Sequence, residues 1–321
     1  MVIDVYRAIL EIVYPAFLTV SLVFQFLLLF LIICHSPKSI QTLRVILRVT
    51  CFFQIMTVFS CWFTQLRLVP TDGPTEMRSY GPCREFEAWI CYLFYQIEQE
   101  SGLASGLTIY ATFFLKYKMV SSVRMSNFSF IMTYVIFYIP LLVSLGAVTI
   151  ILLTQTFPYA IQQQFHLLNS QLTQDYSVIA YLSLAKLPNL LNLVILTGCI
   201  IVIPIMSLYL RKKILTTIDT RIKNMSVPRQ VLYKNFLRGL TIQSILPYII
   251  YFPIYSLDYY CTFTGQTVLL DEYLITLIPA LPSLVDPIIS LYFVTPYRRK
   301  IIQWVKRERD GESLTTVAVT N

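Results

Sequence analysis

The chain has few of the residues from which most enzyme active sites are built. It contains only two histidines, His35 and His166, and both fall outside its long apolar stretches, on opposite sides of the predicted membrane. A metal site of an intramembrane hydrolase or desaturase needs several imidazole ligands, so this arrangement excludes one. No Gly-x-Ser-x-Gly turn and no Ser-Lys arrangement stands out as an activated nucleophile. The sequence therefore predicts no enzymatic activity, no metal and no cofactor.

Polar sequence is also scarce. Charged residues make up 13% of the chain and hydrophobic residues 56%, and no polar segment is long enough to fold separately. About 20 helical residues cross the roughly 30 Å hydrocarbon core of a bilayer. Seven apolar stretches reach this length: Ile9–Cys34, Leu43–Val69, Phe86–Leu115, Asn127–Leu153, Ala185–Leu210, Phe236–Cys261 and Val268–Val294. The pattern predicts an all-α membrane protein built as a seven-transmembrane helix bundle.

Basic residues are distributed unevenly between the two sides of this bundle. With the N-terminus outside, only five of the 25 lysines and arginines fall on the outer side: Arg7, Arg67, Arg78, Arg84 and Lys186. Lysine and arginine in short loops stay on the cytoplasmic side during insertion, so we expect the N-terminus outside and the C-terminus in the cytosol. The net charge of +8 then describes a basic cytoplasmic face. Such a face suits anionic lipids and acidic partners rather than nucleic acid.

The segment after the seventh stretch has a pattern of its own. From Thr295 to Arg307 apolar residues alternate with basic ones, as in a short amphipathic helix lying in the membrane interface. We expect residues 1–306 to form the seven-helix domain and residues 307–321 to be a disordered cytoplasmic tail.

One of the seven cysteines differs in position from the rest. Six lie in or at the ends of predicted spans, where reduced packing residues are expected. Cys83 lies just before the third span, on the oxidising outer side. Its favoured partner within the chain is Cys261, at the outer end of the sixth span, and the alternative is a free or intermolecular Cys83.

Polar residues inside the apolar stretches are the main functional signal, because ionisable groups in a membrane are costly and normally face the bundle interior. Three stripes recur at helical spacing. They are Glu98, Ser101, Ser105, Thr108 and Thr112 in the third span; Ser244, Tyr248, Tyr251, Tyr255 and Asp258 in the sixth; and Glu272, Thr276, Pro279, Ser283, Asp286 and Ser290 in the seventh. Such faces can enclose a ligand cavity that opens to the outside.

A set of candidate ligand contacts follows from these stripes: Glu98, Ser101, Tyr248, Tyr251, Tyr255 and Asp258. The alternative is structural, because small hydroxyl side chains let helices pack closely and tyrosines pack well near an interface. Packing explains Glu98 less well, since a buried carboxyl group must be protonated or paired. Prolines in the later spans bend their helices, which either lets the bundle hold two packings or simply fits the helices together.

Four sequence runs, taken together, resemble a known family. They are His35-Ser36-Pro37-Lys38-Ser39, Tyr80-Gly81-Pro82-Cys83-Arg84, Gly239-Leu240-Thr241-Ile242-Gln243-Ser244-Ile245-Leu246-Pro247, and Pro282-Ser283-Leu284-Val285-Asp286-Pro287-Ile288-Ile289-Ser290-Leu291-Tyr292 followed by Thr295-Pro296-Tyr297-Arg298. The combination resembles the nematode serpentine receptors of class delta over nearly the whole chain. The resemblance implies a chemoreceptor of the G-protein-coupled type, in the plasma membrane of sensory neurons and their cilia, with a small-molecule ligand that the resemblance does not identify.

The match to rhodopsin-like receptors more broadly is partial. Lys116-Tyr117-Lys118 stands where those receptors have Asp-Arg-Tyr, and Asp286-Pro287-Ile288-Ile289-Ser290 stands where they have Asn-Pro-x-x-Tyr. We expect the activation switch to comprise Asp286, Pro287, Ser290 and Tyr292, with Asp286 either protonated or bound to a cation together with Ser290. A heterotrimeric G protein would meet the inner surface at Lys116, Lys118, Arg211, Lys212, Lys213, Lys234 and Arg238.

Two other classes stay open at this point. A ligand-gated channel subunit would form oligomers and conduct without a G protein. An accessory or heteromeric membrane partner would have no ligand of its own, and a receptor oligomer is a related arrangement. A transporter is disfavoured because the chain has no internal repeat.

Overall fold

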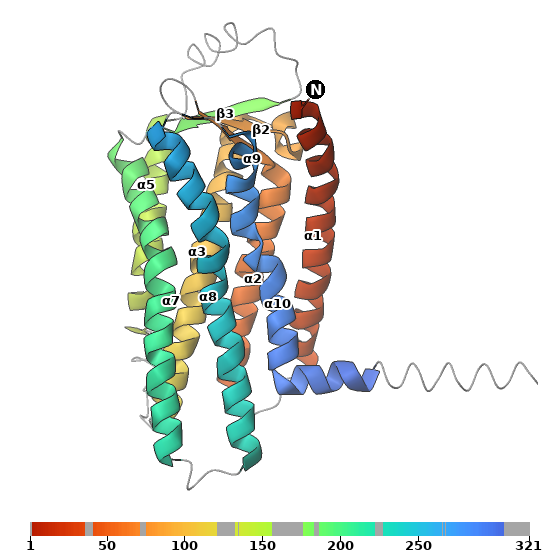
Figure 1. Cartoon of the computed structure of the whole chain (residues 1–321), viewed down its shortest axis with the longest axis vertical. Coiled ribbons are helices and arrows are strands. Elements are labelled where there is room, and N and C mark those ends of the chain that lie inside the picture. The colour runs from red at the N-terminus through yellow and green to blue at the C-terminus, as the bar shows by residue number, and fades with distance from the viewer. Residues whose placement is uncertain are drawn as a thin grey trace, which may run out of the picture.

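The computed structural model describes residues 2–35, 41–70, 75–120, 132–133, 135–155, 176–182, 186–221, 227–264, 266 and 268–304. In this part of the chain the long helices stand side by side as one bundle (Figure 1). The first six predicted spans correspond in order to α1 (Val2–Cys34), α2 (Gln41–Thr64), α3 (Ala88–Val120), α5 (Ile139–Gln155), α7 (Leu187–Arg221) and α8 (Val227–Thr264). The seventh consists of α9 (Leu269–Leu277), η4 (Ile278–Ala280) and α10 (Pro282–Phe293).

Within the described residues, five helical segments are long and apolar enough to cross a membrane. They are Val5–Cys34, Arg44–Thr64, Leu187–Thr217, Leu237–Cys261 and Leu269–Phe293. Helix α3 has 33 residues but is more polar, since it carries Glu98 and Glu100, and α5 is shorter at 17 residues. Large apolar side chains such as Ile12 and Leu153 are exposed on the outside of the bundle, where lipid covers them at no cost. The prediction of an all-α membrane bundle is confirmed.

The seventh span is not one continuous helix. Pro279 and Pro282 flank the break between α9 and α10, and neither residue has a backbone N–H to continue the helical hydrogen bonds. The hydroxyl of Tyr251 in α8 donates a hydrogen bond to the carbonyl oxygen of Pro279 at 2.8 Å. Helix α8 thereby satisfies a backbone group at the break, and the two elements are joined halfway along the bundle.

One end of the bundle is covered by a small sheet that the sequence does not predict. Its strands are β1 (Leu66–Val69), β2 (Thr75–Ser79) and β3 (Ser177–Leu182), antiparallel in the order β1-β2-β3. The sheet lies at the same end as the N-terminus (Figure 1). Helix α2 ends at Thr64, short of the predicted Val69, because Gln65 adopts the left-handed backbone conformation (φ 41°) that commonly follows a helix.

Strand β1 is tied to α9 by a buried ion pair. Nη2 of Arg67 lies 2.6 Å from Oε2 of Glu272, and the guanidinium group lies over the ring of Tyr273 at 4.8 Å from its centroid. Burial acts to lower the pKa of Arg67, but the hydrogen bond and charge of Glu272 outweigh burial and raise that pKa. Thr276 adds a hydrogen bond to the carbonyl oxygen of Leu66 at 2.8 Å. The sheet is therefore fastened to the seventh span.

The cysteine pairing predicted from the sequence is wrong. Cys83 is bonded to Cys91, eight residues later, and Cys261 is a free buried thiol. The short helix η2 (Pro82–Glu85) turns the chain back over the first turns of α3, which places the Cα atoms of Cys83 and Cys91 5.4 Å apart. Gly81 makes this turn feasible, because a Cβ atom there would lie 2.2 Å from the carbonyl oxygen of Phe63. The bond fastens the segment before α3 to α3 itself.

The helix predicted after the seventh span is present at 295–304. It leaves the end of α10 opposite the N-terminus roughly at right angles and points away from α7 and α8 (Figure 1). Ile301 and Trp304 pack against the core cluster at this end, and the Trp304 ring meets His35 at 5.6 Å between centroids. This placement agrees with a helix in the membrane interface. The predicted tail, 307–321, lies outside the described residues.

Candidate functional site

A cavity lies inside the bundle between α3, α7, α8 and the broken seventh span. Its free volume, measured to the centres of water-sized molecules, is about 80 Å³. By the same measure roughly 10–15 Å³ holds one water molecule. The cavity therefore has room for a small organic molecule.

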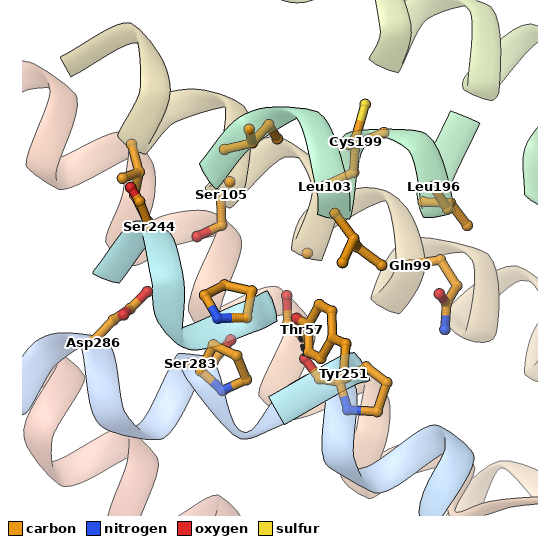
Figure 2. Close-up of a pocket in the computed structure, with 18 of the residues that line it drawn as sticks. Thr57, Gln99, Leu103, Ser105, Leu196, Cys199, Ser244, Tyr251, Ser283 and Asp286 are labelled. Atoms are coloured by element: carbon orange, nitrogen blue, oxygen red, sulfur yellow. Dashed lines mark hydrogen bonds between the residues drawn. The ribbon is translucent and has the colours of Figure 1, made fainter. Parts of the chain in front are cut away.

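The lining of the cavity is divided between polar and apolar side chains. In the view of Figure 2, Ser105, Ser244 and Asp286 gather at one end, and Leu103, Leu196 and Cys199 lie at the other. The wall formed by α7 is apolar and includes Leu196, Cys199, Ile200, Ile203 and Pro204. A ligand that fits this site must present both an apolar body and at least one polar group.

The structure brings three of the six predicted ligand contacts together. Glu98, Tyr251 and Tyr255 all line the cavity. Ser101 is one layer removed, since its hydroxyl lies 2.7 Å from that of Thr57, and Thr57 is the residue that lines the cavity. The shared position of Glu98, Tyr251 and Tyr255 on the cavity wall supports the prediction that they contact a ligand. The contact itself stays a prediction.

The other two predicted contacts lie elsewhere. Tyr248 is 38% exposed and its ring packs against Phe252. It follows Pro247, which does line the cavity, by one residue, and a step of about 100° around the helix turns it outward. Asp258 lies beyond Tyr255 toward the sheet end, where it interacts electrostatically with Tyr255 and Asp271. The polar stripe predicted on this helix does face the cavity at Ser244, Tyr251 and Tyr255, but the stripe is longer and wider than the cavity.

Glu98 is a buried carboxyl group with few interactions. The residue is 3% exposed. Within the described part of the chain neither carboxyl oxygen accepts a hydrogen bond of standard geometry, and the thiol of Cys61, a weak donor, interacts with it. An unpaired polar group in a dry interior is costly, and a charged one more so. Glu98 is therefore suited to an additional partner.

Asp286, the second carboxyl group that lines the cavity, is part of a hydrogen-bond network. Its Oδ2 accepts a hydrogen bond from Nε2 of Gln54 in α2 at 2.6 Å. The same nitrogen lies 3.3 Å from Oγ of Ser105 in α3. Oε1 of Gln54 accepts a hydrogen bond from Gln25 in α1 at 2.9 Å, and Gln25 also donates to the carbonyl oxygen of Ser283 at 2.8 Å. Gln54 thus connects α1, its own helix α2 and α3 to the seventh span.

A second glutamine continues the network into α8. Nε2 of Gln243 donates to the backbone oxygen of Asp286 and to Oγ of Ser290, each at 3.0 Å. The sequence reasoning missed Gln25, Gln54 and Gln243, although a glutamine in an apolar span is the same signal that singled out Glu98. The hydroxyl of Ser290 accepts a hydrogen bond from Gln243. Oδ1 of Asp286 has no hydrogen-bond partner among the described residues.

Two of the four predicted switch residues share this network. Asp286 and Ser290 lie one turn apart on the inner face of α10, and Pro287 is buried beside them. Tyr292 is 58% exposed and packs against Phe293 and Arg298. Two residues after Ser290, it is turned about 200° from the network. The structure thus separates Tyr292 from the other three residues.

Several prolines, which weaken a helix locally, line the cavity. Four prolines line it: Pro204 of α7, Pro247 of α8, and Pro279 and Pro282 at the break in the seventh span. A molecule in the cavity would touch these prolines directly. The shape of such a molecule can therefore act at positions where the helices lack a backbone hydrogen bond.

The predicted G-protein face lies near the opposite end from the sheet. Lys212, Lys213 and Arg238 are exposed, while Arg211 and Lys118 are half-buried. The amino group of Lys213 lies 4.7 Å from the ring centroid of Tyr209. The side chains of Lys116 and Lys234 lie outside the described part of the structure. The described basic residues come from α3, α7 and α8, which are also the helices that form the cavity.

Known sequences match this chain over nearly its whole length. A family model described as "Serpentine type 7TM GPCR chemoreceptor Srd" matches residues 10–303. The chain is 36% identical over 316 residues to serpentine receptor class delta-40 of Caenorhabditis elegans, in an alignment that covers 98% of each chain. It is 35% identical over 307 residues to serpentine receptor class delta-44 of the same organism, in an alignment that covers 95% of each chain.

Proposed function

Because the chain belongs to the class delta family of serpentine chemoreceptors, we propose that it is a sensory receptor that binds a small molecule and signals to a heterotrimeric G protein. The ligand site is the cavity between α3, α7, α8 and the seventh span. The signalling surface is the basic end of the same helices. The receptor acts in the plasma membrane, in the ciliary membrane of sensory neurons.

One observation carries this proposal: the cavity and the hydrogen-bond network share Asp286 and Ser105. The network joins α1, α2, α3, α8 and α10 through Gln25, Gln54 and Gln243. A molecule that fills the cavity therefore touches residues whose hydrogen bonds fix the relative positions of five helices. A purely structural network would not need an adjacent space for a ligand.

Signalling follows from a shift between two packings of the bundle. Prolines at the cavity allow α7, α8 and the seventh span to bend, and a ligand that prefers one bend shifts the population toward it. Helices α7 and α8 carry the bend to Arg211, Lys212, Lys213 and Arg238 at the far end. A basic surface there complements acidic residues of a G protein.

The first experiment is a ligand screen in a heterologous cell. An N-terminal tag should be accessible from outside intact cells, and volatile and water-soluble molecules are tested for calcium or cAMP responses. A response that G-protein inhibition abolishes supports the proposal. A ligand-evoked current that persists under inhibition contradicts it and favours a channel subunit.

Charge reversal tests the signalling surface. We expect Lys212→Glu with Lys213→Glu to lower the potency of the G-protein response by at least about tenfold, because like charges at an interface repel. Lys186→Glu is the matched control, since Lys186 is exposed at the sheet end. Surface display, measured with the tag, should be equal for all variants. Equal signalling by the double variant would exclude this surface.

A further inference from the structure

The cavity carries acidic groups without a basic counterpart. Glu98 and Asp286 line it, and none of the described residues that line it is lysine or arginine. An opposite charge close to a buried carboxyl group favours its ionised form and pairs with it. The lining therefore favours a cationic molecule over an anionic or neutral one.

The two carboxyl groups differ in how well the protein satisfies them. Asp286 accepts a hydrogen bond from Gln54, whereas neither oxygen of Glu98 has a standard hydrogen bond within the described residues. Burying a carboxylate without a partner is unfavourable, and an opposite charge nearby offsets the desolvation. Glu98 is thus the group that gains most from a ligand cation.

Aromatic rings line the same cavity as this carboxyl group. Tyr251 and Tyr255 are both part of its wall, with ring centroids 6.1 Å apart and planes at 90°. A cation is also attracted to the face of an aromatic ring. Across the cavity, Leu196, Ile200 and Ile203 of α7 offer an apolar wall.

We propose that the ligand is a small organic amine. Its ammonium group pairs with Glu98 beside the two tyrosines, and its apolar body lies against α7. This inference rests on the proposed function, since it names the ligand class for the same cavity. It concerns binding alone and involves no covalent step.

The test uses matched pairs of molecules on the purified full-length protein. Phenethylamine and isoamylamine are each compared with the alcohol of the same shape, phenethyl alcohol and isoamyl alcohol, at millimolar concentration in detergent. We expect the amines to raise the melting temperature of the protein and the alcohols to raise it much less. Equal shifts for amine and alcohol, or no shift with either amine, would overturn the proposal.

Two isosteric variants locate the effect. Glu98→Gln removes the unpaired carboxyl group, so we expect the empty protein to become more stable while its affinity for the amines falls by at least about tenfold. Glu100→Gln is the control. Glu100 is also buried in α3, but its Oε1 lies 2.5 Å from the hydroxyl of Ser144 and it does not line the cavity. Amine binding should survive in Glu100→Gln.

Other results have separate meanings. If Glu98→Gln destabilises the empty protein and binds amines as the wild type does, Glu98 has a packing role and the proposal fails. If alcohols bind and trigger a G-protein response, the ligand class is wrong but the receptor function stands. If amines bind through Glu98 and no signalling follows in cells, the ligand class stands and the proposed function fails.

Discussion

Asp286 and Glu98 are both carboxyl groups at the wall of one cavity, 2% and 3% exposed, yet the protein treats them differently. Asp286 is hydrogen-bonded to Gln54 and through it to α1 and α3. Among the described residues, neither carboxyl oxygen of Glu98 accepts a hydrogen bond of standard geometry, and the thiol of Cys61 is a weak donor to it. The carboxyl group of Asp286 thus joins helices, whereas that of Glu98 has unused hydrogen-bonding capacity. Satisfaction of hydrogen bonds, more than burial, separates the two roles.

Removing Gln54, the centre of the network, should have the largest effect, because it leaves Asp286, like Glu98, without a hydrogen bond of standard geometry among the described residues. Gln54→Leu takes the donor from Asp286 and the acceptor from Gln25, so it leaves a buried carboxyl group unsatisfied. We expect the free energy of unfolding to fall by about 3 kcal/mol, at the upper end of the cost of leaving a buried polar group without its partner. Thermal denaturation of the purified protein measures it.

The double variant Gln54→Leu with Asp286→Leu is the control. Replacing both partners by apolar groups leaves no unsatisfied carboxyl group, so much of the lost stability should return. Wild-type stability in the single variant would mean that the network does not join the helices.

A smaller change tests the predicted switch at Asp286. In Asp286→Asn, one oxygen still accepts from Gln54, but an amide that needs an acceptor replaces the unpartnered Oδ1. We expect a loss of about 1–2 kcal/mol in stability, together with a changed basal activity or ligand response in cells. If basal activity and response both stay as in the wild type, Asp286 is not part of the switch.

Much of this arrangement could be predicted from the sequence. Span positions follow from hydrophobic length, and the place of Glu98, Tyr251 and Tyr255 follows from helical spacing, because both depend on local pattern. Tyr248 does not line the cavity, because helical spacing shows which face a residue shares but not how wide a cavity is. Only the packing of α7 against α3 and α8 determines that width.

Other features depend on contacts that local pattern does not encode. The Cys83–Cys91 bond requires the turn at Gly81, which depends on the close approach of the Phe63 carbonyl oxygen. Strand β3 pairs with β2 from about a hundred residues away. The glutamine network becomes visible only when Gln25, Gln54 and Gln243 are found around Asp286. Each of these was hidden because its partner is distant in the sequence.

The smallest expected effect separates the cavity from the outer surface of one helix. Tyr255 lines the cavity and Tyr248, two turns earlier on α8, is turned away from it. Replacing Tyr255 by Leu keeps apolar volume but removes the ring, so ligand potency should fall by about fivefold, the size of one aromatic contact. Tyr248→Leu should leave potency unchanged. A dose–response curve for each variant at equal surface display makes the comparison. Equal losses in both would mean that the ligand does not distinguish the two faces of α8, and the cavity would then not be its site.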